Sequence, residues 1–329
     1  MLTIFVLGSN SFAGSCFVNA ALTAGHKVIG INRSPEGPHF FLRYRHNSRR
    51  ANYQFHQLDL NRDLAGIKEL VISATPDYVV DFAGQGMVAE SWLHPEQWYQ
   101  TNIISKVRLH DFLRSQDWLK KYIRVSTPEV YGSTQQLIQE DHSYNPSTPY
   151  AVSHAAIDMS LTAFYKQYGF PVVLTRFANF FGPGQQLYRI VPRTILFILD
   201  GRKLQLHGGG TSVRAFIYGD DVADGLLRVI DRGRIGDAYH FSPDKFFTIR
   251  QIVERICEKM GANFSKTIEV SADRQGKDQA YLMDASKAVK ELGWKAAIDL
   301  DAGIDATISW VRTNFNDLKT LSWNYEHKQ

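Results

Sequence analysis

Short apolar runs alternate with helical patterns along the first half of the chain. An apolar run at 2–7 ends in a glycine, a helical pattern follows at 12–24, and a second apolar run lies at 27–31. Buried parallel strands separated by helices are typical of a doubly wound parallel sheet, the Rossmann arrangement of the α/β class. The same periodicities predict further strands at 53–57, 78–82, 122–126 and 172–176, and helices at 65–75, 96–116 and 150–168.

The pattern changes after about residue 178. Glycine and proline cluster at 182–184 and 208–210, where shorter elements alternate with loops. We therefore predict a Rossmann domain at 1–178, with returning segments near 214–242 that include a strand at 237–241. A smaller C-terminal substrate-binding lobe is predicted from 179–213 and 243–329.

Composition excludes several other classes of protein. The 329 residues are 44% hydrophobic and 21% charged with a net charge of +4, as in an ordinary globular protein. A basic stretch at 43–50 is interpreted as a solvated loop, with nucleic-acid binding as the weaker alternative. The two distant cysteines indicate neither a disulfide framework nor a metal cage, and the histidines lack metal-ligand spacing. Without a leader pattern or a long apolar run, a cytoplasmic location and no contact with membranes are predicted.

A glycine-bearing segment stands where the first strand turns into the first helix. Gly8 can make the tight turn and Gly14 can let the helix approach closely, as a dinucleotide pyrophosphate requires. The middle glycine of a G-x-x-G-x-x-G pattern is replaced here by Ser11. A turn without any ligand is the alternative. The predicted cofactor contacts in this segment are Gly8, Asn10, Ser11, Phe12, Ala13 and Gly14.

The residues that follow the second predicted strand indicate whether NAD or NADP binds. A carboxylate there would bind the ribose hydroxyls of NAD, but the chain has Asn32, Arg33 and Ser34. Because an arginine suits an extra phosphate, NADP is favoured and NAD is the alternative. Asp59 and Leu60 are expected near the adenine, and Phe82, Ala83 and Gly84 on the floor of the site.

Candidate catalytic residues follow two later strands. Tyr150 and His154 are four residues apart at the start of a predicted helix, which puts both on one face. The segment 126–132 contains Thr127 and Glu129 and follows a strand at its carboxyl end, where open α/β sheets form their active sites.

With these motifs in place, the chain resembles the extended short-chain dehydrogenase/reductase superfamily over nearly its whole length. Within it, the chain is similar to the nucleotide-sugar 4,6-dehydratases that act on dTDP-glucose or GDP-mannose. The motifs that carry the resemblance are the glycine turn and the segments 82–91, 101–102, 126–132, 150–154, 176–183, 214–221, 273–278 and 291–294.

The resemblance implies a reaction and a role for each catalytic residue. Tyr150 would take the proton from the hydroxyl at carbon 4 of the sugar while hydride passes to the nicotinamide. Thr127 would hydrogen-bond the oxygen at carbon 4, and Glu129 would remove the proton at carbon 5, so that water leaves from carbon 6. These roles require an ionisable phenol, a hydroxyl donor and a carboxylate.

Two positions depart from the family pattern. Pro128 cannot donate the proton that an aspartate provides in the dTDP-glucose enzymes, so the chain fits the GDP-mannose style better, as does Arg33. His154 replaces a lysine that holds the nicotinamide ribose and lowers the pKa of the tyrosine. A free histidine titrates near ~6.5 and is mostly uncharged at neutral pH. If the charge is needed, His154→Lys should raise turnover near neutral pH.

The partner is expected to be a nucleotide-diphosphate sugar. A diphosphate needs cations, and Arg189, Arg214 and Arg274 occupy positions that resemble the diphosphate binders of the family. The resemblance also implies a homodimer formed through the helices at 96–116 and 150–168. Further predicted substrate contacts are Gln85, Ser91, Asn102 and Asn179.

Other functions stay open at this point. A nucleotide-sugar epimerase or a decarboxylase of a nucleotide-linked uronic acid is the nearest alternative, although an ordinary 4-epimerase does not need the base Glu129. A non-catalytic sensor of NADP or sugar nucleotides would explain Ser11, Pro128 and His154. Retention of Tyr150 favours an enzyme.

Overall fold

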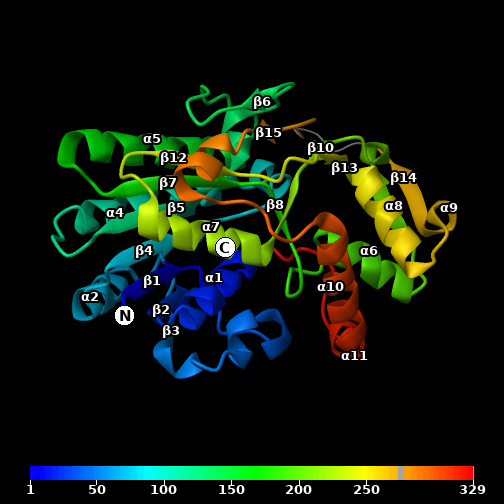
Figure 1. Ribbon diagram of the computed structural model, residues 1–329, viewed down its shortest axis with the longest axis horizontal. Coiled ribbons are helices and arrows are strands. Elements are labelled where there is room, and N and C mark those ends of the chain that lie inside the picture. The colour runs from blue at the N-terminus through cyan, green and yellow to red at the C-terminus, as the bar shows by residue number, and fades with distance from the viewer. Residues whose placement is uncertain (273–277, 329) are drawn as a thin grey trace.

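The computed structural model describes residues 1–272 and 278–328. Its centre is a seven-stranded sheet in which all neighbouring strands are parallel, in the order β12-β7-β5-β4-β1-β2-β3 (Figure 1). The strand order reverses at β1, and ligands of open α/β sheets bind at such a switch point. The strands are β1 (Thr3–Leu7), β2 (Lys27–Asn32), β3 (Tyr53–Gln57), β4 (Tyr78–Asp81), β5 (Lys121–Ser126), β7 (Val172–Phe177) and β12 (Ala238–Phe241).

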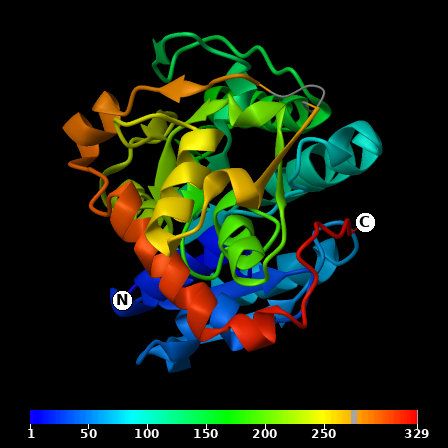
Figure 2. The same cartoon turned by 90° about the vertical axis from the view of Figure 1, so that its right-hand side faces the viewer.

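Helices cover both faces of the sheet, as the alternating pattern predicts (Figures 1 and 2). On one face α1 and α7 pack against β1 and β5 through residues such as Phe17 and Leu226. On the other face α2, α4 and α5 bury residues such as Ile67, Leu109 and Ile157. The predicted doubly wound α/β fold is confirmed. These helices are α1 (Phe12–Thr23), α2 (Leu64–Ala74), α4 (Ser105–Leu113), α5 (Pro149–Tyr168) and α7 (Gly219–Arg232).

A second hydrophobic core lies beyond the carboxyl ends of the strands. Ile195, Ile256 and Ile308 bring α6, α8 and α10 together around the short strands β9 and β14 (Figure 2). Within the described ranges no helix is long and apolar enough to span a membrane. The remaining elements are α3 (Pro95–Tyr99), α6 (Ile190–Leu199), α8 (Ile249–Met260), α9 (Phe264–Thr267), α10 (Leu300–Thr313), α11 (Phe315–Leu318), β6 (Leu137–Ile138), β8 (Asn179–Phe181), β9 (Leu204–His207), β10 (Val213–Arg214), β11 (Phe216–Tyr218), β13 (Phe247–Thr248), β14 (Ile268–Ser271) and β15 (Leu282–Met283).

The helix predicted at 96–116 is interrupted. The structure has α3, then one π-helical turn at Gln100–Ile104, and then α4, which ends at Leu113. A π turn accommodates one extra residue within the helix. Within that turn, the Asn102 amide is hydrogen-bonded to the neighbouring loop and to α5. These contacts form with residues far away in the chain, so apolar periodicity cannot reveal them.

The basic stretch at 43–50 is solvated only in part, and its exposed residues are Arg45, His46, Ser48 and Arg49. It folds into short 3₁₀ turns against α1, and the side chain of Tyr44 is fully buried. Glu36 forms ion pairs with Arg45 and Arg50 at 3.0 and 3.5 Å. The positive charge of this segment is therefore partly neutralised within the fold.

Candidate active site

The turn after β1 brings the backbone close to the edge of the sheet. Gly8 has a φ of +81°, and a Cβ there would lie 3.0 Å from the backbone nitrogen of Ala83. A Cβ on Gly14 would lie 2.3 Å from the Gly8 carbonyl oxygen. Ser11 caps α1, because its Oγ accepts a hydrogen bond of 3.0 Å from the Gly14 N–H. Only small residues fit these positions, so the turn suits a pyrophosphate at a helix N-terminus. The same turn contains Asn10, Phe12 and Ala13.

The end of β2 lies beside this turn and carries two cations. Asn32 Nδ2 donates to the Ser34 carbonyl oxygen at 3.2 Å, which closes the loop after the strand. Arg33 Nη2 donates to Gln85 Oε1 at 3.3 Å. Lys328, near the other end of the chain, places its Nζ 3.1 Å from Ser34 Oγ and its carbonyl oxygen 2.7 Å from Gln85 Nε2. Sequence patterns gave no sign of Lys328, because it lies in a short C-terminal segment without periodicity.

The loops after β3 and β4 form the rest of the predicted cofactor region. Asp59 Oδ1 accepts a hydrogen bond of 2.8 Å from the backbone of Asn61, so this carboxylate stabilises its own turn, and Leu60 is buried. Phe82 and Gly84 follow β4 directly, and the Phe82 N–H donates to β1. The predicted contact of Asp59 with adenine stays a prediction.

The predicted catalytic residues come together at the carboxyl end of β5. Tyr150 and His154 lie in the first two turns of α5 with their ring centres 4.6 Å apart. Thr127 directly follows β5 and hydrogen-bonds with Tyr150 through its side chain. Its Oγ1 also accepts a hydrogen bond of 3.3 Å from the backbone of Glu129, in the 3₁₀ turn that follows. A strand, a turn and a helix thus converge on one site.

Glu129 is poised between its protonated and ionised forms. Burial disfavours the carboxylate and raises the pKa of Glu129 to about 7, although the Arg214 and Arg189 cations oppose the rise. The negative charge of Asp278 adds to it. A carboxyl group whose pKa lies near neutrality can act both as a base and as an acid.

Burial raises the pKa of Tyr150, and the carboxylate of Glu129 raises it further. The hydrogen bond with Thr127 opposes this rise. The charge of Arg189 also acts to lower the pKa of Tyr150 but does not offset the effect of burial. Because a phenol acts as a base only after losing its proton, Tyr150 needs a further cation that favours the phenolate.

His154 is not that cation. Burial and then the positive charges of Arg124 and Lys106 hold the pKa of His154 well below its ordinary value. Its Nδ1 lies 3.0 Å from Arg124 Nη2. The imidazole is therefore neutral at physiological pH.

Two predicted substrate residues hold the loop after β4 in place. Asn102 is fully buried, and its amide bonds the backbone N–H and carbonyl of Gln85 at 2.8 and 3.1 Å and Ser153 Oγ at 2.9 Å. Ser91 is also buried, and its Oγ accepts a hydrogen bond of 3.2 Å from the backbone of Tyr150. Both side chains occupy supporting positions here, and their direct contact with a substrate stays a prediction.

The predicted diphosphate binders Arg189 and Arg214 lie near Glu129. Arg214 donates to three backbone carbonyl oxygens and stacks over the ring of Tyr281, 4.1 Å from its centre. Tyr281, which the sequence did not single out, donates to Asn179 Oδ1 at 2.6 Å. Arg189 is exposed at the N-terminus of α6. Arg274 lies outside the described residues.

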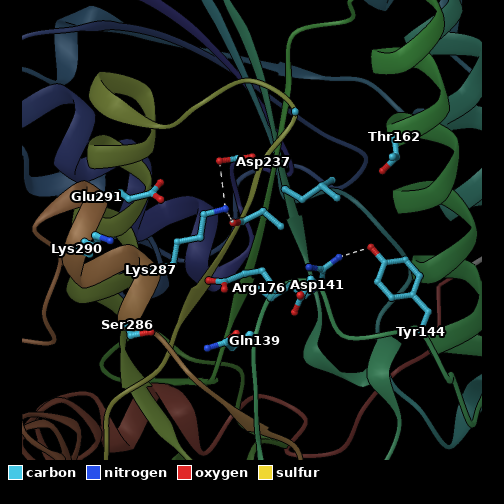
Figure 3. Close-up of a pocket in the computed structure, with 14 residues that line it drawn as sticks. Gln139, Asp141, Tyr144, Thr162, Arg176, Asp237, Ser286, Lys287, Lys290 and Glu291 are labelled. Carbon is cyan, nitrogen blue, oxygen red and sulfur yellow. Dashed lines mark hydrogen bonds and ion pairs between the residues drawn. The ribbon is translucent and has the colours of Figure 1, made fainter.

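A separate cavity of about 730 Å³ opens at the β7–β12 edge of the sheet (Figure 3). None of the described residues predicted for the site lines it. Two of its three cations are engaged locally, since Arg176 bonds Tyr144 and Lys287 lies 3.2 Å from an oxygen of Asp237. This cavity is therefore distinct from the candidate active site.

The parallel sheet, the glycine turn at its switch point and the tyrosine on α5 define an extended short-chain dehydrogenase/reductase. The chain belongs to the GDP-mannose 4,6-dehydratase family, whose family model matches residues 5–307. Dehydratases are hydro-lyases, and two related dehydratase structures contain NAD.

Individual relatives and solved structures are similar to this chain along nearly its whole length. A probable dTDP-glucose 4,6-dehydratase of Sinorhizobium fredii is 31% identical over 95% of this chain and 93% of its own length. The crystal structure of a dTDP-glucose 4,6-dehydratase from Streptomyces venezuelae, with NAD bound, has a TM-score of 0.88 and 28% identity, covering 96% of this chain and 98% of its own. The UDP-glucose 4-epimerase of Thermotoga maritima has a TM-score of 0.86 and 26% identity, covering 95% and 100%.

Proposed function

We propose that Tyr150, Thr127 and Glu129 carry out the 4,6-dehydration of a nucleotide-linked hexose. The observation that supports this most is the position of Glu129, a carboxyl group with a pKa of about 7 beside Tyr150. A reaction confined to carbon 4 needs only the tyrosine, whereas proton removal from carbon 5 needs a second base.

The first step oxidises carbon 4. Tyr150 takes the proton of the carbon-4 hydroxyl, while Thr127 donates a hydrogen bond to the same oxygen. When bound, the nicotinamide supplies the hydride chemistry, accepting a hydride from carbon 4 and later returning one to carbon 6. The glycine turn at Gly8 and Gly14 fits the pyrophosphate of such a cofactor.

The second step removes water. The new ketone acidifies the proton at carbon 5, which Glu129 takes, and the hydroxyl at carbon 6 leaves as water with the proton from Glu129. Since Pro128 has no proton to donate, the same carboxyl group serves as base and acid. After hydride reaches carbon 6 and a proton returns to carbon 5, the net change is the loss of one water.

Each part of the chain has a proposed ligand. Residues 1–178, with the returning segments near 214–242, bind the dinucleotide. Residues 179–213 and 243–329 bind the sugar nucleotide. Arg189 from this part and Arg214, at the edge of the returning segments, contact the diphosphate. The proximity of both arginines to Glu129 supports this arrangement, because it places the diphosphate binders beside the reacting sugar.

NADP is the proposed cofactor, although the related dehydratase from Streptomyces venezuelae contains NAD. Arg33 at the end of β2 supports this choice, and Lys328 adds a second cation beside Ser34. Arg33→Ala should weaken NADP binding by about tenfold or more and leave NAD binding nearly unchanged. Equal losses for both cofactors, measured by calorimetry, would contradict a phosphate contact.

A homodimer is proposed through α4 and α5. The faces of these helices include Met159, which is 61% exposed, and Val152. Light scattering on the purified protein should give twice the chain mass, and Met159→Glu should shift it toward the monomer. The predicted cytoplasmic location stays a prediction.

The decisive experiment is mass spectrometry of purified protein with NADP or NAD and a panel of GDP-, dTDP-, UDP- and CDP-hexoses. Loss of one water from one substrate, without net cofactor reduction, is expected. A product of unchanged mass and altered configuration would indicate an epimerase, which the similarity to the Thermotoga enzyme makes the second candidate. Cofactor binding without any product would indicate a sensor, and Tyr150→Phe should abolish whatever turnover is found.

A further inference from the structure

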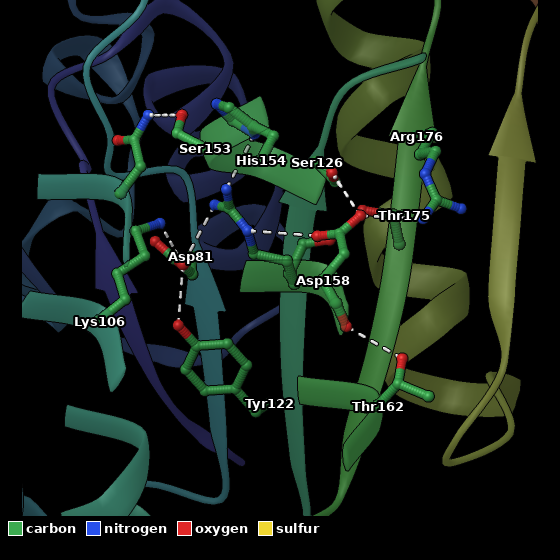
Figure 4. A network of polar contacts seen from close by, with 12 residues as sticks. Asp81, Lys106, Tyr122, Ser126, Ser153, His154, Asp158, Thr162, Thr175 and Arg176 are labelled. Carbon is green, nitrogen blue, oxygen red and sulfur yellow. Dashed lines mark hydrogen bonds and ion pairs between the residues drawn. The ribbon is translucent and has the colours of Figure 1, made fainter. Parts of the chain in front are cut away.

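A buried network of charged groups lies directly behind His154 (Figure 4). Arg124, in the middle of β5, has no exposed surface, and its Nη2 lies 3.0 Å from His154 Nδ1. A guanidinium has only hydrogen-bond donors, so Nδ1 must be the acceptor and the imidazole proton must reside on Nε2. Within the described part of the chain, Nε2 has no hydrogen-bond partner, which leaves its proton available to a bound ligand.

The network carries one positive charge in excess. Asp81 accepts from Lys106 Nζ at 2.6 Å and from Arg124 Nη1 at 3.2 Å. Asp158 accepts from Arg176 Nη2 at 2.9 Å, and its other oxygen lies 4.0 Å from Arg124 Nε. Three cations thus face two carboxylates, before any charge on His154 is counted.

The other titratable groups around this network do not cancel the excess charge. Burial lowers the pKa of His110 to about 3, and burial and the charge of Asp81 raise that of Tyr122, so both are neutral. Burial, with a further contribution from Arg124, lowers the pKa of Lys106 to about 7 even against the charge of Asp81, so the excess of one positive charge is complete only below neutral pH. The groups that face His154 and Arg124 come from β4, α4, β5, the turn after β5, α5 and β7: Asp81, Lys106, His110, Tyr122, Glu129, Tyr150, Asp158 and Arg176.

We propose that Arg124 is a positioning residue for the dehydration, a role that rests on the function proposed above. It holds His154 in the neutral tautomer that donates from Nε2 to a ribose hydroxyl of the bound dinucleotide. Its own fixed charge, one hydrogen bond behind the imidazole, favours the ionised form of Tyr150. A lysine at position 154 would both donate to the ribose and supply a positive charge. Here His154 donates the hydrogen bond and Arg124 supplies the charge.

Because Arg124 already supplies the positive charge, we expect His154→Lys to lower turnover rather than to raise it. The ammonium group introduced by this substitution would face Arg124 directly and bring the excess to two positive charges. Arg124→Gln would reduce the excess to zero and free Nδ1. The double variant would restore an excess of one, because the introduced ammonium group would replace the charge of Arg124, while Asp81 and Asp158 would keep Lys106 and Arg176.

The test is a double-mutant cycle in the cofactor-loaded protein with its best sugar nucleotide. Each single variant should lower kcat by about 10- to 100-fold, the range seen when a group that orients a ligand is removed. KM for the sugar nucleotide should be unchanged. The double variant should recover at least about tenfold over the product of the single losses. As the pH falls, Arg124→Gln should recover activity relative to the wild type, because loss of the Arg124 charge raises the pKa of His154 and a protonated imidazole would supply the missing positive charge.

Two outcomes would overturn the proposal: His154→Lys alone being at least as active as the wild type, or single losses that simply multiply in the double variant. Arg228→Gln, at an exposed ion pair, serves as the matched control and should leave kcat unchanged. Thermal unfolding of each variant checks that it folds.

The tautomer is measured separately by ¹⁵N NMR of His154 in the protein without substrate. Neutral imidazole with its proton on Nε2 between pH 5 and 8 is expected, and a cationic or Nδ1-protonated ring would refute the role of Arg124. Because this measurement needs no turnover, it tells failure of this proposal apart from failure of the proposed reaction.

Discussion

Asp81 and Glu129 are two carboxylates at the same end of the sheet with opposite environments. Asp81 ends β4 and accepts hydrogen bonds from Lys106, Tyr122 and Arg124 at 2.6, 2.8 and 3.2 Å. Although burial acts to raise it, these donors hold the pKa of Asp81 below its ordinary value. The Glu129 carboxylate accepts no hydrogen bond from the described residues, and its pKa rises to about 7.

The contrast shows how one side-chain chemistry serves two purposes. Burial alone makes a carboxyl group hold its proton, and nearby cations and direct hydrogen-bond donors oppose that effect. Asp81 therefore stays ionised and anchors the cations behind His154. Glu129 can exchange its proton near neutral pH, as a base that must later act as an acid requires.

Replacing Glu129, the carboxylate without hydrogen-bond donors, should have the largest effect on kcat. Glu129→Gln removes the base for carbon 5 and should lower kcat for water loss by about 10²–10⁴-fold. Mass spectrometry of the sugar nucleotide measures the rate of water loss. Glu254→Gln, at an exposed pair with Arg250, is the control. A Glu129 variant of nearly full activity would show that another group takes the proton.

Removing a hydrogen-bond donor of Asp81 should lower the stability of the fold. Lys106→Met leaves Asp81 without its shortest donor and should lower the free energy of unfolding by about 1–3 kcal/mol, the usual cost of losing a hydrogen bond to a buried charged group. Urea denaturation measures this loss. A loss below about 1 kcal/mol would mean that Tyr122 and Arg124 suffice for Asp81.

The pH dependence of stability should distinguish the two carboxylates further. Glu129 has a native pKa of about 7, above its ordinary 4.5, so the folded state binds this proton more tightly. Its contribution is fully present below about pH 4.5 and is lost as pH rises to 7, by about 1–3 kcal/mol. Glu129→Gln should therefore gain stability over the wild type at pH 8 but not at pH 4. An identical difference at both pH values would contradict the raised pKa.

An exposed pair gives the smallest expected effect. Arg228 and Asp224 are one helical turn apart on α7, with their side chains 37% and 45% exposed and 2.7 Å between Nε and Oδ2. Arg228→Gln should change the free energy of unfolding by at most about 0.5 kcal/mol. A larger loss in urea would mean that Arg228 acts through the carbonyl oxygens of Leu292 and Gly293.

The sheet and the catalytic residues could be predicted because their signals are local. Buried parallel strands appear as apolar runs, and Tyr150 and His154 share a helix face at a fixed spacing. The strand at 53–57 matches β3, and the predicted return at 237–241 matches β12 beside β7.

The charged network could not be predicted because its members meet only in the fold. Asp81 lies within the strand predicted at 78–82, and Arg124 lies within the strand predicted at 122–126. A charge inside a buried strand is a signal that a partner must exist. The identity of the partner is not encoded nearby: Lys106 lies on a helix 25 residues after Asp81.

The π turn at Gln100–Ile104 has a consequence for how this helix tolerates change in length. Each residue of an α-helix turns the chain by about 100°. Deleting one residue from the turn would give a regular helix but rotate α3 against α4 by about that angle. Trp98, now fully buried and stacked on His327, would swing away from its contacts. The extra residue therefore sets the relative rotation of the two helical segments, so length variation should be tolerated elsewhere along the chain but not here.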